Sequence, residues 1–102
     1  MSVTVFVEFP LTEDGAQQVI AWANSDDGEP VTKKQKGFKS VQSYLAQDNK
    51  TVMMVMEWDS IEDHQAYYRF RQQQGVDEFI APLLEGEIKV LYATAVQKPK
   101  DN

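Results

Sequence analysis

The sequence predicts an α+β domain in which two strand–helix–strand crossovers flank one hairpin, giving a four-stranded antiparallel sheet with both long helices on one face. Three observations predict this ferredoxin-like βαββαβ order. Alternating apolar residues mark strands near both ends of the chain, apolar residues at helical spacing mark two helices, and Asp48-Asn49-Lys50 has hairpin-turn chemistry. A single domain over residues 1–97 and a polar tail over 98–102 account for the chain.

The first strand and the first helix follow from two different spacings of apolar residues. A strand that ends at Pro10 carries four apolar residues on one face: Val3, Val5, Val7 and Phe9. Thr12 is placed to cap the following helix, which has acidic residues in its first turn. The stripe of this helix that packs on the sheet consists of Ala16, Val19, Ile20 and Ala23.

Glu8 lies on the opposite face of the first strand from these apolar residues. Two interpretations are open for it. It is either a carboxylate at an exposed edge or a polar group that points into a cavity between the sheet and the helices.

The strand over Thr51 to Trp58 contains five successive apolar residues, from Val52 to Met56. A strand packed on one side alternates apolar with polar residues, so this run indicates that both faces are covered. The two helices can cover only one face of the sheet. We therefore expect a second copy to supply the other, in a homodimer closed sheet against sheet.

The strand before the hairpin turn extends from Gly37 to about Gln47. Its side chains are expected to divide between two faces, with Phe38, Tyr44 and Ala46 on one and Val41 and Leu45 on the other.

The second long helix is predicted from about Ile61 to Gln74, with Ser60 as its cap and Gly75 at its end. Ile61, His64 and Tyr68 share one side, and Ala66, Tyr67 and Phe70 form a second; Arg69 and Arg71 are expected in solvent. A short helix over Asp77 to Leu84 and a last strand from Glu87 to about Gln97 complete the order.

Composition limits the partners that the chain can have. The net charge of −6 argues against nucleic acid or an anionic membrane as the main partner. There are no cysteines, which excludes disulfides and thiolate chemistry. The acidic segment with Asp26, Asp27 and Glu29 lacks the ligand spacing of a calcium loop, so no metal site is expected. The N-terminal residues do not have the pattern of a secretion signal, and we expect a cytoplasmic protein.

Three features together carry a family resemblance: Gly37-Phe38 before a strand, a Met/Val-rich strand that ends in Glu57-Trp58, and Asp59-Ser60-Ile61-Glu62 at the start of a helix. They resemble the antibiotic biosynthesis monooxygenase-like family of the dimeric α/β-barrel superfamily, over about Val3 to Val96. The family includes cofactor-independent quinol oxygenases and haem-degrading enzymes, so the fold alone does not determine the reaction.

The two enzymatic branches of the family imply different residues. The haem-degrading branch implies an Asn, a second Trp and a His at positions that here hold Val7 or Glu8, Tyr67 and approximately Asp77. The chain departs from that pattern at all three. The quinol-oxygenating branch implies a pocket at Trp58, Met54 and His64, with Met54 in place of a polar Asn. This resemblance implies no cofactor.

His64 is the only histidine, and its usual pKa of about 6.5 suits proton abstraction from a phenol. The alternative is a histidine at the start of a helix that is bonded to a backbone group or to water. The residues expected to bind a substrate beside this catalytic base are Glu8, Met54, Met56, Trp58, Tyr67 and Tyr68. Two hypotheses follow. The chain is a cofactor-independent monooxygenase that acts on a small aromatic or quinol-type compound, or it is a non-catalytic dimeric domain that binds a small ligand or only associates.

Overall fold

The computed structural model describes residues 2–96. Its four strands, in the order β2-β3-β1-β4, form a sheet in which every neighbouring pair is antiparallel. The strands are β1 (Val3–Pro10), β2 (Phe38–Leu45), β3 (Thr51–Trp58) and β4 (Lys89–Ala93). The predicted ferredoxin-like α+β fold is confirmed. The polar tail predicted over 98–102 lies outside the described residues, as does Gln97 at the end of the last predicted strand.

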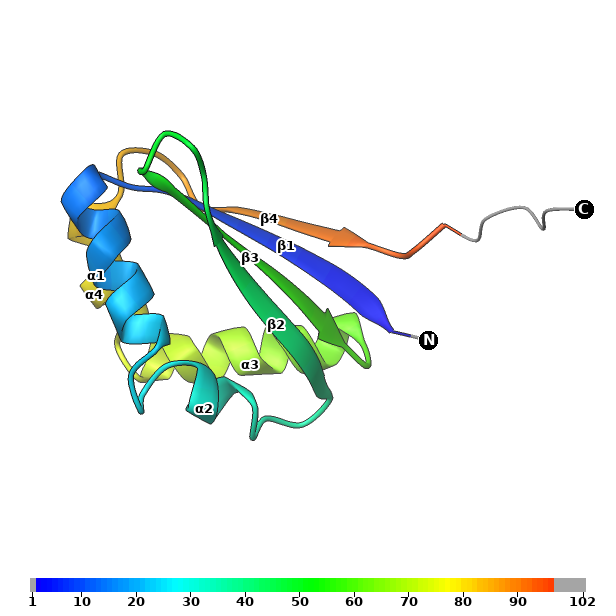
Figure 1. The fold of residues 1–102 in the computed structure, drawn as a ribbon. Coiled ribbons are helices and arrows are strands. Elements are labelled where there is room, and N and C mark those ends of the chain that lie inside the picture. The colour runs from blue at the N-terminus through cyan, green and yellow to red at the C-terminus, as the bar shows by residue number, and fades with distance from the viewer. Residues whose placement is uncertain (1, 97–102) are drawn as a thin grey trace, which may run out of the picture.

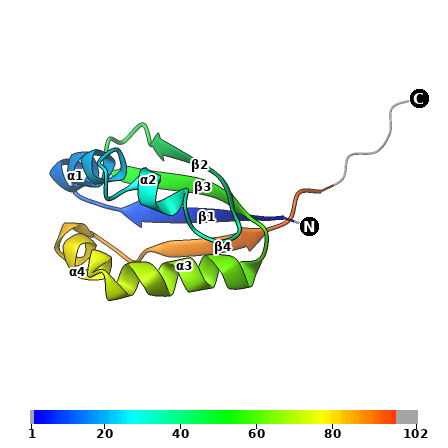
Figure 2. The same ribbon diagram turned by 90° about the horizontal axis from the view of Figure 1, so that it is seen from below.

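The helices all lie on one side of the sheet (Figure 1). They are α1 (Glu13–Ala23), α2 (Glu29–Thr32), α3 (Ile61–Gln73), α4 (Val76–Ile80) and a 3-10 turn, η1 (Ala81–Leu83). Figure 2 shows α1 and α2 on the side of β2, whereas α3 lies along β4. No helix in the described part of the chain is long and apolar enough to cross a membrane.

Both long helices begin at the predicted capping residues. The backbone N–H of Gly15 donates to Thr12 Oγ1 at 2.9 Å, and that of Asp63 donates to Ser60 Oγ at 3.1 Å. Each bond satisfies a donor that the first helical turn leaves free. The helix starts are therefore encoded locally, by single hydroxyl side chains.

The register of β1 against β3 determines which residues face the helices. Val5 pairs with Met56 and Val7 with Met54, so these four side chains lie on the helix-covered face. Together with α1, this face forms the core; its largest fully buried side chains are Trp58, Leu11, Val5, Val19 and Val52. The odd-numbered residues of β1 and the even-numbered residues of β3 therefore line the space under the helices.

The expectation that Phe38 and Tyr44 share one face of β2, with Val41 on the other, was wrong. Phe38 pairs with Trp58 and Val41 with Met56, so Phe38 and Val41 share the helix-covered face. The register shifts between Phe38 and Ser40, and this irregularity adds one residue to β2 relative to β3. Tyr44 consequently lies on the opposite face from Phe38, because an extra residue exchanges the two faces of a strand.

The other face of the sheet is left open by the described residues and is partly apolar. Phe6, Tyr44 and Leu91 are 36%, 54% and 63% exposed, and Val55 pairs with Phe6 at the centre of this face. Val55 is half-buried by its neighbours. Monomeric proteins seldom expose a connected apolar patch on a sheet.

Candidate functional site

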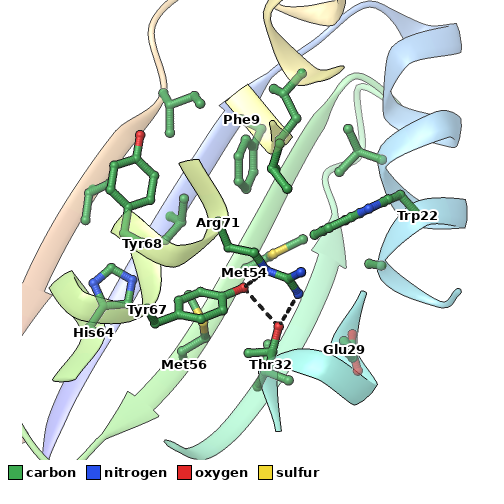
Figure 3. A pocket seen from close by; sticks show the side chains of 18 of the residues that line it. Phe9, Trp22, Glu29, Thr32, Met54, Met56, His64, Tyr67, Tyr68 and Arg71 are labelled. Carbon is green, nitrogen blue, oxygen red and sulfur yellow. Dashed lines mark hydrogen bonds between the residues drawn. The ribbon is translucent and has the colours of Figure 1, made fainter. Parts of the chain in front are cut away.

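A cavity of about 80 Å³ lies between the helix-covered face of the sheet and the helices (Figure 3). Strand residues such as Phe9, Met54 and Met56 give it apolar walls. Its polar groups come from the helices, chiefly from α3. This combination of apolar walls with a few convergent polar groups is typical of small-molecule sites.

The polar groups of α3 form one stripe. His64, Tyr67 and Arg71 are spaced by three and four residues, so all three point to the same side of the helix. All three line the cavity, and His64 and Arg71 are each only 4% exposed. A helix ordinarily packs on a sheet through apolar residues, whereas α3 buries an imidazole and a guanidinium and half-buries the phenol of Tyr67.

His64 is enclosed by aromatic rings. Its ring centroid lies 5.8 Å from that of Trp58 and 5.4 Å from that of Tyr92. Its Nδ1 is 2.8 Å from Tyr92 Oη. Burial lowers the pKa of His64 from 6.5 to about 4, because the surroundings do not solvate an imidazolium. The imidazole is therefore neutral at pH 7 and can accept a proton.

Trp58 lies directly behind this stripe and does not line the cavity. It is fully buried, with its ring centroid 5.1 Å from that of Tyr67 and 5.5 Å from that of Phe38. Its indole Nε1–H is buried and has no acceptor among the described residues. A buried donor without a partner costs about 1–3 kcal/mol, which is the reason that buried indole N–H groups usually have an acceptor.

Arg71 was expected in solvent, and the structure shows that it is buried. The reason is its spacing: at about 100° per residue, the seven residues from His64 bring Arg71 back to the same side of the helix. The guanidinium carbon lies 4.8 Å from the ring centroid of Trp22 and 5.3 Å from that of Tyr67. No carboxylate among residues 2–96 lies within salt-bridge distance of it.

Hydrogen bonds hold this guanidinium on neutral acceptors. Nε donates to Tyr67 Oη, and Nη2 donates to Thr32 Oγ1 and to the carbonyl of Gly28, each at 2.9 Å. Nη1 donates to the carbonyl of Asp27 and to Gln74 Oε1, also at 2.9 Å. All five N–H groups are therefore used, and Arg71 ties α3 to the segment that forms α2.

The structure brings together part of the predicted site. His64, Met54, Met56, Tyr67 and Tyr68 line the cavity. Tyr68 is 42% exposed. These five residues come from β3 and α3, the two elements that the sequence placed next to each other.

Glu8 does not join them. It lies on the open face of the sheet, where its carboxylate is 3.8 Å from Lys89 Nζ. The alternation of β1 explains this position, because Val7 and Phe9 on either side of Glu8 face the helices. The expectation of a polar group inside the cavity was wrong for Glu8, and the edge-facing interpretation agrees with the structure.

Sequence reasoning missed Thr32, Arg71 and Tyr92 as site residues. The helical spacing of His64, Tyr67 and Arg71 was a usable signal for Arg71. Thr32 and Tyr92 come from α2 and β4, which lie far from α3 in the sequence. Only tertiary packing brings them to α3, so no local pattern could have indicated them.

Among the described residues, no group of three or more His, Asp or Glu side chains is placed to hold a metal ion. The basic side chains of the cavity are those of His64 and Arg71.

No family model and no curated protein matches the sequence. Solved structures do share its fold. A monooxygenase of Streptomyces coelicolor, in complex with nanaomycin D, is 16% identical with a TM-score of 0.80, over 99% of this chain and 93% of that one. SnoaB, a cofactor-independent oxygenase of Streptomyces nogalater, is 14% identical with a TM-score of 0.72, over 98% of each chain.

A candidate antibiotic biosynthesis monooxygenase of Bordetella bronchiseptica is 13% identical with a TM-score of 0.71, over 94% of this chain and 98% of that one. Identities this low are evidence of a shared fold and do not carry over an activity. The chain therefore has the fold of the antibiotic biosynthesis monooxygenase-like proteins.

Proposed function

We propose that this chain is a cofactor-independent monooxygenase that acts on a small aromatic or quinol-type compound in the cavity between the sheet and the helices. The observation that carries the proposal is the polar stripe of α3, which places His64, Tyr67 and Arg71 over a cavity whose strand walls are apolar. Oxygenases among the proteins of the same fold, one of them named as cofactor-independent, support it.

His64 is the proposed base. Its pKa of about 4 makes the ring neutral at pH 7, so a lone pair is available. For this role Nδ1–H donates to Tyr92 Oη, which leaves Nε2 as the proton acceptor. A phenol that transfers its proton to Nε2 forms an ion pair with the imidazolium, and this pairing raises the pKa of His64 above its value in the free protein.

The reaction needs no oxidant other than O₂. A phenolate is electron-rich at ring carbon and transfers electrons to O₂, forming a C–O bond to a hydroperoxide. Loss of water from the hydroperoxide leaves a ring C=O. Overall, a phenol and O₂ give a quinone and water, and the substrate supplies all four electrons. Apolar walls favour this sequence because they exclude water from the carbanion-like intermediate.

The cavity is too small to take up the aromatic ring of a substrate without rearrangement. A volume of about 80 Å³ is smaller than the roughly 150 Å³ of a protein cavity that holds benzene. Binding therefore requires side chains to move. Met54 and Met56 are suited to this, because the unbranched thioether side chain has several low-energy conformations.

The test is O₂ uptake by the purified protein with phenol, hydroquinone and 1-naphthol, measured above the rate without protein. We expect His64→Gln to reduce the catalysed rate by roughly 10²–10⁴-fold, the usual contribution of a general base. Glu62→Gln, an exposed change on the same helix, should keep the wild-type rate. A His64→Gln protein as active as wild type would remove His64 from the mechanism.

The alternative function is a non-catalytic domain that binds a small ligand or only associates. Two observations favour it: the small cavity and the complete burial of Trp58 behind His64 and Tyr67. The same assay separates the two functions. Binding of the aromatic probes without any O₂ uptake above the control would support the alternative.

We further propose that two copies associate through the open faces of their sheets. Phe6, Val55 and Leu91 form an apolar centre on this face, and β-sheets in other proteins pack face to face through such centres. The ion pair of Glu8 with Lys89 lies at one end of the same face. A second copy would cover the exposed apolar side chains without changing the helix-covered side.

A further inference from the structure

Tyr67, Thr32 and Arg71 form a closed triangle of hydrogen bonds at the wall of the cavity (Figure 3). Both hydroxyl oxygens accept an N–H from Arg71, and they lie 2.9 Å from each other. Between these oxygens there is room for one proton. One hydroxyl therefore donates to the other, and the proton of the second hydroxyl points elsewhere. If the second hydroxyl is that of Tyr67, its proton can be donated to a ligand in the cavity.

Among the described residues, the other acceptor near the Thr32 hydroxyl is the carbonyl of Gly28, at 3.4 Å from Oγ1. It already accepts from Arg71 Nη2 at 2.9 Å and from the backbone N–H groups of Val31 and Thr32 at 3.0 and 3.2 Å. A carbonyl oxygen has two lone pairs, so a fourth donor at 3.4 Å binds weakly. Thr32 therefore donates its proton to Tyr67 Oη.

Tyr67 Oη then accepts from both Arg71 and Thr32, and its own proton has no acceptor among the described residues. Because Tyr67 lines the cavity, that proton is available to a ligand. The guanidinium strengthens the phenol as a donor, since a cation that donates to its oxygen withdraws charge from the O–H bond.

Building on the proposed function, we infer that Tyr67 is the hydrogen-bond donor that receives the phenolate oxygen of the substrate, and that Arg71 and Thr32 are positioning residues that aim its proton into the cavity. Glu29 and Asp77 also line the cavity and are only half-buried. These two carboxylates disfavour a second negative charge on the ligand. The favoured ligand is therefore a small phenol that ionises at one hydroxyl and carries no acid group.

The experiment uses 4-nitrophenol, whose phenol and phenolate absorb at different wavelengths, and nitrobenzene, which lacks the hydroxyl. Wild-type protein should bind 4-nitrophenol as the phenolate at a pH at which the free probe is mainly protonated. Tyr67→Phe should weaken this binding by roughly 10- to 100-fold, the loss expected for a hydrogen bond to a charged oxygen. Nitrobenzene binding should stay unchanged.

Thr32→Val keeps the shape of the side chain and removes the hydroxyl that directs the Tyr67 proton. It should weaken 4-nitrophenol binding in the same direction and by less, while Arg69→Gln, an exposed change on the same helix, should bind like wild type. Circular dichroism establishes that each variant is folded.

The outcomes separate the inference from the proposed function. If both probes bind and Tyr67→Phe leaves the phenolate signal intact, the role of Tyr67 is wrong and the cavity remains a binding site. If neither probe binds to the wild-type protein, the cavity is not an aromatic site, which overturns both proposals.

Discussion

At the scale of single residues, burial of His64 keeps its imidazole neutral and makes the stability of the fold depend on pH. An imidazole in water would be partly protonated at pH 6.5, whereas burial among Trp58, Tyr67 and Tyr92 keeps it neutral down to about pH 4. Protonation of His64 is therefore less favourable in the folded protein than in the unfolded chain. For the same reason, the imidazole stays unprotonated throughout the neutral pH range.

This difference makes stability depend on pH. Since the pKa of His64 is lower in the folded state, the unfolded state binds more protons between about pH 6.5 and about pH 4, and stability falls as the pH is lowered through this window. We expect the free energy of unfolding to decrease by roughly 3 kcal/mol from this residue alone. Urea unfolding measured across the window checks the prediction.

His64→Gln is the control for this measurement, because glutamine does not titrate. The carboxylates contribute equally to both proteins, so the difference between their stabilities isolates the imidazole. A difference that stays constant from pH 6.5 to pH 4 would show that His64 titrates alike in the folded and unfolded states.

At the scale of elements, the first turn of α3 packs closely against the loop before β2. Gly37 has φ of +82°, a left-handed conformation that glycine adopts without cost. A Cβ at this position would overlap the side chain of Asp63 in the first turn of α3. The glycine of the Gly37-Phe38 pair therefore allows the loop before β2 to approach the first turn of α3 closely.

We expect Gly37→Ala to lower the free energy of unfolding by roughly 1–3 kcal/mol, since alanine is strained at positive φ and also contacts Asp63. Chemical denaturation monitored by circular dichroism measures it. Gly86→Ala is the matched control, because a Cβ there meets only Pro10, at 3.3 Å. Equal losses for the two variants would contradict a special role for Gly37.

The elements themselves could be predicted because each depends on local patterns. Thr12 and Ser60 mark the helix starts, and the alternation from Val3 to Phe9 marks β1. The irregularity in β2 could not be predicted, because it depends on how β2 pairs with β3. The helix α2 was missed as well, since four residues give too short a pattern.

The candidate site was predicted in part for a similar reason. His64 and Met54 lie on elements whose contact follows from the fold. Arg71 was misjudged because an isolated arginine is usually solvated, and its burial depends on acceptors from residues 27–32. Those acceptors reach Arg71 only when α2 packs beside α3.

At the scale of the whole molecule, the open sheet face is the surface through which we propose that two copies associate. Val55 lies at its centre and pairs with Phe6 of β1 and Gln42 of β2. The run from Val52 to Met56 is apolar on both faces, so the helices account for only half of it. The other half agrees with association through the sheet.

Val55→Lys should dissociate the proposed dimer, because it would bury a charge without a partner at the interface. Sedimentation velocity should then give a monomer with an intact circular dichroism spectrum. Gln17→Lys, an exposed change on α1, should leave the assembly as it is in the wild type. If both variants sediment like the wild type, the copies do not meet through this face.

The packing of Trp58 against His64 also gives the protein an optical signal of its own. The chain has two tryptophans, and the ring of Trp58 lies edge-on to the imidazole at 5.8 Å. Imidazolium quenches the fluorescence of a neighbouring indole, whereas neutral imidazole does so much less. The emission of Trp58 should therefore dim as His64 gains a proton, which allows the protonation of the proposed base to be followed without a label or a substrate.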